Sequence, residues 1–567
     1  MTPVPKRGAL HFASQKLYSE FGPSIARAAP PVRTAGCGIL RYAQNDKQRD
    51  SPRRCERRTH GQIPTLGKPN TPRIFATLAS STLAGLEALA GKVDSPEVGL
   101  ELRLDHLKEP NGLESALDQM FSRLHSPPII ATCRRTEAGG LFGGTIEQQG
   151  SLLAAAVRAG CQWVDVEIES VERAGVAWLE QFKPAKVIVS YHNYRAAPPL
   201  PAIYRRLARL PVQSVKVACH VRRLCDNLRI LDLLKSHRNR ARKLVALGMG
   251  GTGIPSRVLA LRYGSAFTYG SAGNHLSVAP GQLPSEVMRT VYRVEHLDRR
   301  TQLFGVVGSR ASLSLSPAMQ NAAFHGKHID AVYLPCETDR LADFLAFARK
   351  LNFQGFSVTM PFKRSIIRAL DWLDPLAARI GACNTVAVQR GKWLGWNTDA
   401  AAVVEVLTKR LRLAGSRILI LGAGGAARAA AYTLRAEGAV VLIAARRDSA
   451  AQRLARGISA QVVPWESTEV IDVDAVINAT PVGMTPQVDA RPIDLSRVRA
   501  RVVFDMVYHP LETRFLTQAR GRGLITISGL EMLVAQGARQ FEIWTGSTAP
   551  RALMEQAARQ VLSHAGA

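Results

Sequence analysis

The sequence lacks the features that would define a membrane, secreted or metal-binding protein. It has no run of 18 or more apolar residues, and its start lacks the apolar core of a signal peptide. The eight cysteines are spread over 567 residues and include no CxxC pair, a pattern that favours neither a disulfide framework nor a zinc site. We therefore expect a cytoplasmic protein with reduced thiols, no membrane partner and no bound metal.

Acidic residues are also scarce, with 45 Asp and Glu against 74 Lys and Arg, and the formal net charge of +29 raises the possibility of nucleic-acid binding. Residues 1–73 hold 14 basic and 4 acidic residues, and they have no helical or strand period. We interpret residues 1–72 as a disordered basic extension or as the product of a start codon placed too far upstream. The other arginines are scattered without interleaved aromatic residues, which favours a solvated basic surface over nucleic-acid binding.

The length, with 46% hydrophobic and 21% charged residues, indicates two to four globular domains. Residues 73–298 alternate eight short apolar runs with helical patterns, which predicts an α/β fold, a closed (β/α)8 barrel. Barrel enzymes carry their chemistry at the carboxyl ends of the strands. The polar or sulfur-containing residues expected near those ends are Glu101, Arg103, Arg134, Glu167, His192, Lys216 and Met249.

Lys216 and His192 are the pair that favours catalysis in this barrel. A lysine flanked by apolar residues is more easily deprotonated, and its neutral amine can attack a carbonyl group. His192 ends the preceding strand and can act as a general base. With arginines at other strand ends and loops, the pattern favours an imine-forming lyase that acts on an anionic keto substrate. The alternative is an inward lysine that a nearby carboxylate neutralises.

Five motifs of this region resemble type I 3-dehydroquinate dehydratase: residues 100–105, 190–194, 214–218, 249–257 and 279–282. The resemblance implies that Lys216 forms the imine and that His192 moves the proton for the loss of water. It further implies substrate-binding or positioning roles for Glu101, Arg103, Arg134, Arg257 and Gln282. Two positions depart from the family pattern: Val278 stands where a serine is usual, and Glu137 is displaced by one residue from the family's glutamate.

Residues 302–567 are predicted to form two further domains: an α/β domain of residues 302–400 and 530–567, and a Rossmann domain of residues 401–529. The glycine turn of the second domain follows a strand and opens a helix, which is the context for binding a pyrophosphate. It consists of Gly422, Ala423, Gly424, Gly425 and Ala426. The next strand ends in Arg446 and Arg447 instead of an acid, which suits the 2′-phosphate of NADP.

The loops after the strands of residues 302–400 are rich in small hydroxyl and amide groups, as a polyhydroxylated acid would require. Lys363 and Asp399 are the acid/base pair among them. These motifs, with residues 477–484, 505–510 and 529–536, resemble shikimate dehydrogenase over about residues 302–565. In that family many members have Asn at Ser357, and Tyr is common at Trp396.

The second resemblance assigns three groups of residues. The implied substrate-binding residues are Ser314, Ser316, Thr359, Asn384, Tyr508 and Gln536. The implied NADP-binding residues are those of the glycine turn with Arg446, Arg447, Thr480, Gly529 and Met532. Lys363 and Asp399 would manage the proton that accompanies hydride transfer.

Together the two resemblances imply a bifunctional enzyme of the shikimate pathway. It would dehydrate 3-dehydroquinate to 3-dehydroshikimate and then reduce that product to shikimate with NADPH. Two alternatives stay open at this point: one half could be an inactive scaffold, or the chain could be a basic protein associated with nucleic acid through its first residues.

Overall fold

The computed structural model describes residues 72–565, apart from residues 94, 109–111, 125–127, 239–240 and 274–275. The expected basic extension lies outside the described residues except for its last residue, so the interpretation of residues 1–72 stays a prediction. Among the described helices none is long and apolar enough to cross a membrane.

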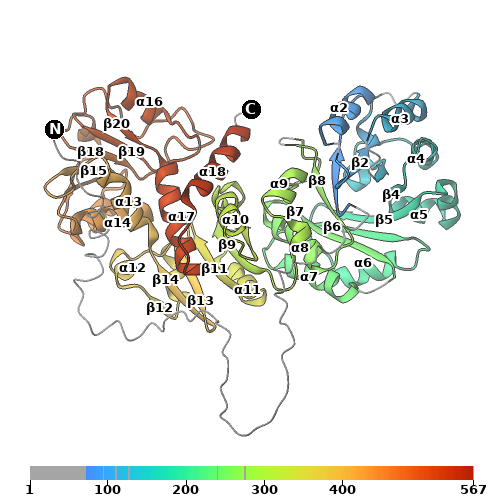
Figure 1. Ribbon diagram of the computed structural model, residues 1–567, viewed down its shortest axis with the longest axis horizontal. Coiled ribbons are helices and arrows are strands. Elements are labelled where there is room, and N and C mark those ends of the chain that lie inside the picture. Colours follow the sequence, from blue (N-terminus) through green and yellow to red (C-terminus); the bar gives the residue numbers. More distant parts are fainter. Residues whose placement is uncertain are drawn as a thin grey trace, which may run out of the picture. The chain divides into compact units, whose positions relative to one another are not determined.

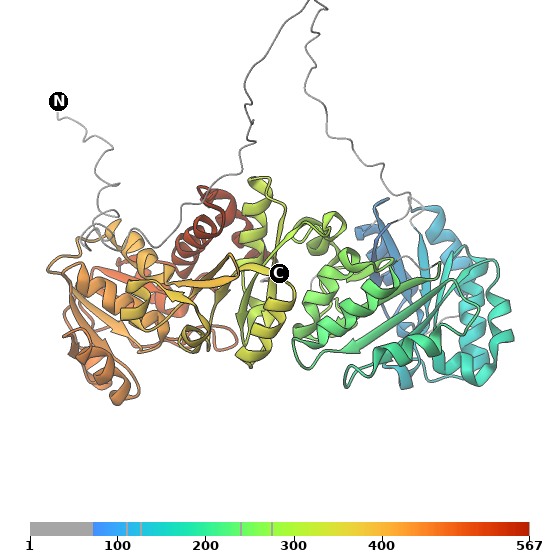
Figure 2. The same cartoon turned by 90° about the horizontal axis from the view of Figure 1, so that it is seen from below.

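The first part of the chain is a barrel of parallel strands surrounded by helices (Figures 1 and 2). Its strands are β1 (Ile74–Leu78), β2 (Val98–Arg103), β3 (Ile129–Thr132), β4 (Trp163–Glu167), β5 (Lys186–Asn193), β6 (Ser214–His220), β7 (Lys243–Met249) and β8 (Thr268–Ser271). The helices are α2 (Leu83–Val93), α3 (Leu113–Ser122), α4 (Ile146–Arg158), α5 (Ile168–Ala174), α6 (Leu200–Leu207), α7 (Asp226–His237), α8 (Ile254–Tyr263) and α9 (Ser285–Thr290).

The order of these strands confirms the expected (β/α)8 fold, with one difference at the seam. The sheet runs β7-β6-β5-β4-β3-β2-β1-β8, and the described residues form no ladder between β7 and β8. Instead the Ala266 amide, just before β8, donates a hydrogen bond of 2.9 Å to the Leu244 carbonyl on β7. The barrel is therefore nearly closed.

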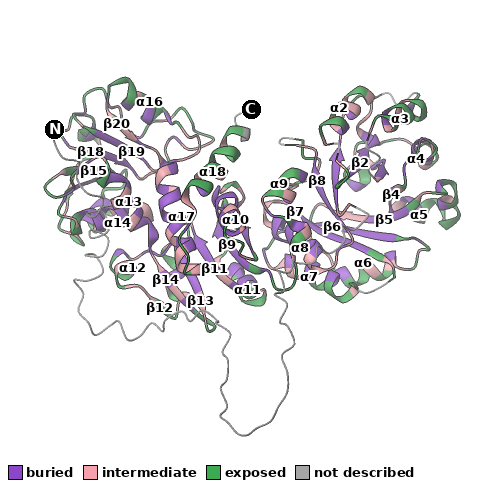
Figure 3. Cartoon of the chain, in the orientation of Figure 1, coloured by how far each residue is buried: buried purple, intermediate pink, exposed green. Residues whose placement is uncertain are grey.

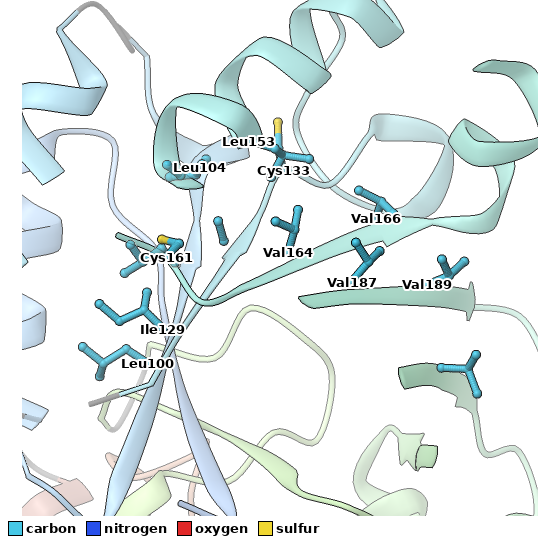
Figure 4. Packing of buried hydrophobic residues seen from close by; sticks show 14 of the residues in the cluster. Leu100, Leu104, Ile129, Cys133, Leu153, Cys161, Val164, Val166, Val187 and Val189 are labelled. Carbon is cyan, nitrogen blue, oxygen red and sulfur yellow. The ribbon is translucent and has the colours of Figure 1, made fainter. Parts of the chain in front are cut away.

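Alternation along the strands separates the outer core of the barrel from its interior. On β2, Leu100 and Leu102 belong to the hydrophobic core that includes residues of the surrounding helices, whereas Glu101 and Arg103 line an interior pocket. Figure 4 shows part of this outer core, where Leu100 lies beside Ile129 of β3. Because successive residues of a strand point to opposite faces, a single apolar run supplies both packing and chemistry.

The second part begins with a mixed sheet of order β10-β9-β11-β13-β14-β12. Its strands are β9 (Gln302–Gly308), β10 (Ala331–Glu337), β11 (Phe353–Val358), β12 (Trp372–Leu373), β13 (Thr385–Gln389) and β14 (Lys392–Trp396). Its helices are α10 (Ser316–Gly326), α11 (Leu341–Lys350) and α12 (Pro375–Ile380), and α13 (Thr398–Thr408) follows β14.

Two helices from the end of the chain complete this mixed-sheet unit. They are α17 (Gly529–Thr545) and α18 (Arg551–Ala565), and Figure 1 shows them beside α10. The rings of Phe324 on α10 and Phe541 on α17 lie 5.5 Å apart between centroids, and Phe304 of β9 joins the same core. The end of the chain thus packs on strand β9, which lies more than 200 residues earlier in the sequence.

A parallel sheet lies between these two stretches. Its strands are β15 (Arg417–Leu421), β16 (Val440–Ala444), β17 (Gln461–Val462), β18 (Ala475–Asn478), β19 (Val502–Asp505) and β20 (Ile525–Ile527), with helices α14 (Gly425–Ala436), α15 (Asp448–Arg456) and α16 (Arg514–Gly521). The order β17-β16-β15-β18-β19-β20 is that of dinucleotide-binding sheets, and it confirms the expected Rossmann fold.

The central strand of this sheet is apolar on both faces. Ile418 and Ile420 pack into one core and Leu419 and Leu421 into another, and Figure 3 shows the strands as buried. A parallel sheet covered by helices on both sides needs such a continuous apolar run. The strand order reverses between β15 and β18, and ligands of open α/β sheets bind at this switch point.

Candidate active sites

The seven residues that the dehydratase resemblance implied line one pocket: Glu101, Arg103, Arg134, His192, Lys216, Arg257 and Gln282. Of the two other residues expected at the strand ends, Met249 lines the pocket and Glu167 does not. The seven come from strands β2, β5 and β6, with Lys216 near the start of β6, and from the segments after β3, β7 and β8. Strands far apart in the sequence therefore bring these side chains to one chamber.

Lys216 is buried in this pocket between two carboxylates. Its Nζ atom lies 2.9 Å from Asp165 Oδ2 and 3.4 Å from Glu101 Oε1. The flanking residues Val215 and Val217 belong to the outer core instead. The expectation that apolar neighbours surround the amine is therefore wrong, because neighbours along a strand point to the opposite face.

Asp165 is the centre of a hydrogen-bonded network that the sequence analysis missed. Its Oδ1 atom accepts hydrogen bonds from Arg134 Nη2 at 2.7 Å and from Ser190 Oγ at 2.6 Å. Burial alone would raise the pKa of Asp165, but the positive charges of Arg134 and Lys216 hold that pKa well below its usual range. The alternation in β4 was the available signal, since it places Asp165 on the same face as Glu167.

His192 lies on β5, the strand next to the one that carries Lys216, and its imidazole is a neutral base. Burial and the charges of Arg134 and Lys216 lower the pKa of His192 well below 6.5, so its imidazole is neutral at pH 7. Its Nδ1 atom is buried and has no hydrogen-bond partner among the described residues. The ring stacks with that of Tyr194 at a centroid distance of 6.5 Å.

Arg257 differs from the other two arginines of the pocket because it has no carboxylate partner among the described residues. Arg103 binds Asp105 through two hydrogen bonds of 2.8 and 2.7 Å, and Arg134 binds Asp165. Arg257 is 1% exposed and its Nε atom is unpartnered, while its Nη2 atom donates a 3.5 Å hydrogen bond to the Pro280 carbonyl. Burial lowers the pKa of Arg257 to about 10, which leaves the side chain charged at pH 7. A buried guanidinium without a counter-ion suits an anionic ligand.

The two departures from the dehydratase pattern have different consequences. Val278 lines the pocket, and its amide donates a 3.1 Å hydrogen bond to Gln282 Oε1, which helps to hold that side chain. Glu137 is exposed, forms an ion pair of 2.7 Å with Arg173 and does not line the pocket. The displaced glutamate therefore lies outside the pocket as it stands in this structure.

A second pocket lies where the mixed-sheet unit and the Rossmann unit meet. It is lined by all eight residues assigned to substrate and proton transfer: Ser314, Ser316, Thr359, Lys363, Asn384, Asp399, Tyr508 and Gln536. Three residues of the expected cofactor set also line it: Ala426, Gly529 and Met532. Two positions differ from the residues that are common in shikimate dehydrogenases. Of these, Ser357 lines the pocket and Trp396 does not.

Lys363 and Asp399 form the ion pair of this second pocket. Lys363 Nζ lies 2.7 Å from Asp399 Oδ2, while Asp399 Oδ1 accepts a 2.8 Å hydrogen bond from Asn384 Nδ2. Asn384 is itself held through its Oδ1 atom, which accepts a 2.8 Å hydrogen bond from the Thr398 amide. The carboxylate is thus oriented by an amide on one side and faces the lysine on the other.

The glycine turn is shaped for a close approach to a ligand. Gly422 has φ +115°, and a Cβ atom there would lie 3.1 Å from the Ala479 carbonyl oxygen. Helix α14 then starts at Gly425, and no side chain caps its N-terminus. Free amides at this position fit a pyrophosphate group.

The remaining cofactor candidates are not among the residues that line the second pocket. They are Gly422, Ala423, Gly424, Gly425, Arg446, Arg447 and Thr480. Arg446 and Arg447 are exposed at the end of β16, directly before α15. Thr480 follows β18 at the switch point, and its hydroxyl donates a 2.6 Å hydrogen bond to Asn478 Oδ1. Among the described residues no group of His, Cys, Asp or Glu could hold a metal ion.

The fold and the two pockets define a chain with two enzyme units, a lysine-containing barrel and a dinucleotide-dependent α/β reductase. Family models agree with this division. The type I 3-dehydroquinase model matches residues 74–299, the shikimate dehydrogenase substrate-binding domain matches residues 306–386, and the shikimate 5′-dehydrogenase C-terminal domain matches residues 529–559.

Known proteins resemble the chain over both units. A chloroplastic bifunctional 3-dehydroquinate dehydratase/shikimate dehydrogenase of Arabidopsis thaliana is 33% identical over 81% of this chain and 79% of its own length. A shikimate dehydrogenase (NADP(+)) of Anaeromyxobacter sp. is 45% identical over 46% of this chain and 96% of its own length. The crystal structure of Thermus thermophilus shikimate 5-dehydrogenase with NADP(H) and shikimate is 37% identical over 46% of this chain and 100% of its own, with a TM-score of 0.43.

The chain belongs to the family of bifunctional 3-dehydroquinate dehydratase/shikimate dehydrogenases. It combines 3-dehydroquinate dehydratase activity with NADP-dependent shikimate dehydrogenase activity, a lyase and an oxidoreductase of the shikimate pathway.

The exposed position of Glu137 leads to a prediction. Glu137→Ala should leave the KM and kcat for 3-dehydroquinate within about twofold of the parent values, because an exposed ion pair contributes little. Arg257→Ala is the contrasting variant and should raise KM at least about tenfold, since it removes a buried charge from the pocket. Steady-state kinetics of the dehydratase reaction check both. A large loss of activity in Glu137→Ala would mean that this carboxylate enters the pocket when substrate binds.

Proposed function

We propose that Lys216 forms the covalent imine of the dehydratase reaction with 3-dehydroquinate. The observation that supports this role most strongly is that its buried side chain lines one pocket with His192, a base, and with Arg257, a buried cation that has no carboxylate partner among the described residues. The amine adds to the keto carbon of the substrate, and the carbonyl oxygen leaves as water when the C=N bond forms. Two protons of the ammonium group end on the carbonyl oxygen as it leaves as water, while Asp165 stays ionised and holds the nitrogen in place.

His192 completes the elimination in this proposal. Its neutral imidazole removes a proton from the carbon next to the imine, and the hydroxyl group on the following carbon then leaves as water. The protonated imidazole can return its proton to that departing oxygen. Water finally hydrolyses the imine, which releases 3-dehydroshikimate and restores the Lys216 amine.

Arg257 is the proposed partner of the substrate carboxylate, because Arg103 and Arg134 are already occupied by carboxylates of the protein. Gln282 supports substrate binding beside it, held by its hydrogen bonds to the Val278 amide and Thr77. Glu101 bonds Thr77 and Thr132 and faces Lys216, which suits the positioning of substrate hydroxyl groups. The arginines at the two other strand ends then hold the carboxylates of the site in place.

We propose that the second pocket binds 3-dehydroshikimate or shikimate through its hydroxyl and amide side chains. The residues proposed to bind it are Ser314, Ser316, Thr359, Asn384, Tyr508 and Gln536. Lys363 transfers a proton between its Nζ atom and the substrate oxygen that interconverts between keto and hydroxyl forms, and Asp399 sets the position of that nitrogen. NADP(H), when bound, supplies or accepts the hydride.

The residues proposed to bind NADP lie directly after strands of the Rossmann sheet. The turn from Gly422 to Ala426 and the first turn of α14 bind the pyrophosphate, and Arg446 with Arg447 binds the 2′-phosphate. Gly529 and Met532 line the second pocket, where the nicotinamide must meet the substrate, and Thr480 follows β18 at the switch point of the Rossmann sheet.

We also propose the domain limits 73–298, 302–400 with 530–567, and 401–529, together with a cytoplasmic location. The six described cysteines are free thiols, as is usual in a reducing compartment. The Arabidopsis relative is chloroplastic by name.

If Lys216 forms an imine with the substrate, reduction of that imine should leave a covalent adduct on the protein. Borohydride added during dehydration should attach the substrate skeleton to Lys216 and inactivate the dehydratase while NADPH-dependent reduction continues. Lys216→Met should abolish both trapping and dehydration, whereas His192→Ala should still form the adduct, because the base acts after the nucleophile. Mass spectrometry of the peptide that contains residue 216 checks the site. An unaltered dehydration rate in Lys216→Met would contradict the assignment.

If Lys363 transfers the proton, variants that lack its amine or the Asp399 carboxylate should turn over more slowly. Lys363→Ala and Asp399→Asn should lower kcat for shikimate oxidation by about 10²–10⁴. Ser314→Ala, which changes a binding group in the same pocket, should mainly raise KM and is the matched control. Steady-state kinetics with saturating NADP separates the two effects. If Lys363→Ala changed KM alone, the lysine would be a binding residue and not a proton donor.

The arginines after β16 predict the preference for NADP over NAD. NADP should be favoured by about 10²-fold or more in kcat/KM, because a 2′-phosphate offers them a charge that a hydroxyl does not. Arg446→Ala should remove most of that preference while changing kcat/KM with NAD little. Kinetics with both cofactors measures it. An undiminished preference in the Arg446→Ala/Arg447→Ala double variant would show that other groups read the 2′-phosphate.

A further inference from the structure

Tyr269 carries a hydroxyl group inside the barrel that no described residue bonds. The residue lies on β8 and is 3% exposed, and its hydroxyl oxygen is buried without a hydrogen-bond partner. Buried tyrosines usually direct this hydroxyl to an acceptor, because an unmade hydrogen bond in a dry environment is costly. The side chain has no role in the family assignments given above, so the unpartnered group calls for a physical explanation.

The hydroxyl belongs to the chamber that contains Lys216. Tyr269 lines the same pocket as Lys216, His192 and Arg257, and the Lys216 Nζ atom lies 3.7 Å from the centroid of its ring. The face of the phenol thus contacts the reactive nitrogen. The hydroxyl on the edge of that ring is therefore close to whatever carbon becomes bonded to the nitrogen.

Packing prevents the ring from turning to find another acceptor. Tyr269 pairs with Phe75 across the β1–β8 ladder, and its ring lies 6.3 Å from that of Phe75 and 5.6 Å from that of Phe267. These aromatic side chains belong to the core at the floor of the barrel interior. A ring fixed by a strand and two aromatic neighbours holds its hydroxyl in one place.

The nearby carboxylates are engaged elsewhere and keep the phenol protonated. Glu101 accepts hydrogen bonds from Thr77 at 2.7 Å and Thr132 at 3.1 Å, while Asp165 is bonded by Ser190 and Arg134. Burial and the negative charges of Glu101 and Asp165 raise the pKa of Tyr269 well above 10. The group is therefore a hydrogen-bond donor at neutral pH, and the described protein residues provide no acceptor for it.

We propose that Tyr269 is a further substrate-binding residue of the dehydratase, whose hydroxyl donates a hydrogen bond to an oxygen of the substrate next to the carbon that Lys216 attacks. The ligand class is a cyclic polyhydroxylated keto acid, which carries oxygens on neighbouring ring carbons. This inference rests on the proposed imine at Lys216, because the contact between ring and nitrogen sets where the hydroxyl lies.

Tyr269→Phe tests the proposal because it removes the hydroxyl and keeps the ring against Lys216. The KM for 3-dehydroquinate should rise about tenfold, equivalent to roughly 1.4 kcal/mol, with kcat within about threefold of the parent value. The melting temperature of the substrate-free variant should be unchanged or higher, since an unsatisfied buried hydroxyl is lost. An unchanged KM would overturn the proposal, and so would a fall in melting temperature that accompanies the loss of activity, because that result indicates a structural role.

A matched control and a trapping experiment keep the two proposals distinguishable. Tyr292→Phe removes the hydroxyl of a tyrosine that is also buried but does not line the pocket, and KM should not change. Borohydride should trap the imine on Lys216 in both the parent and Tyr269→Phe. Trapping in Tyr269→Phe with parental KM would refute the role of Tyr269 alone. Absence of any adduct in the parent enzyme would refute the imine, and with it the placement of the Tyr269 hydroxyl.

Discussion

A lysine inside a protein must have partners for its charge, and the interior of the barrel is organised around this requirement at Lys216. Asp165 and Glu101 face its ammonium group, and Arg134 in turn neutralises and orients Asp165. Buried charges are tolerated when they are paired and hydrogen-bonded, and removing one member leaves the others costly. The same network that makes the lysine tolerable therefore also fixes its nitrogen in the pocket, and burial together with the charges of Arg134 and Lys216 lowers the pKa of His192. If Lys216 is the nucleophile that we propose, stability and catalysis depend here on one set of contacts.

The lysine of the second pocket is paired in a different way from Lys216. Lys363 and Asp399 lie at the junction of two units, where one partner is fixed by Asn384 and the other reaches into the pocket. The lysine needs only one carboxylate because it is less buried than Lys216. This arrangement leaves its nitrogen free to exchange a proton with a bound oxygen. An ion pair at a domain junction is thus suited to proton transfer, and a buried cluster is suited to holding a nucleophile.

Unpartnered polar groups mark where each site meets its ligand. In the barrel, Arg257 has no carboxylate partner and Tyr269 has no acceptor among the described residues, although both are buried. In the Rossmann unit, the amides at the start of α14 have no side-chain cap, and Arg446 and Arg447 are exposed beyond β16. Native proteins leave few such groups without reason. Their locations outline an anionic hydroxylated substrate in one unit and a phosphorylated cofactor in the other.

Most of the architecture was readable from the chain, because local patterns encode it: eight apolar runs for the barrel, and a strand, glycine turn and helix for the Rossmann unit. The motifs also named Lys216, His192, Lys363 and Asp399. The sequence could not show which side chains lie next to each other in space. Asp165 and Tyr269 contact Lys216 from strands that are more than 50 residues away along the chain. Only the closure of the strands into a barrel decided that carboxylates, and not Val215 or Val217, surround the lysine. The structure also decided that Glu137 is exposed, because it lies in the short 3-10 turn Thr136–Ala138 after β3, where it pairs with Arg173.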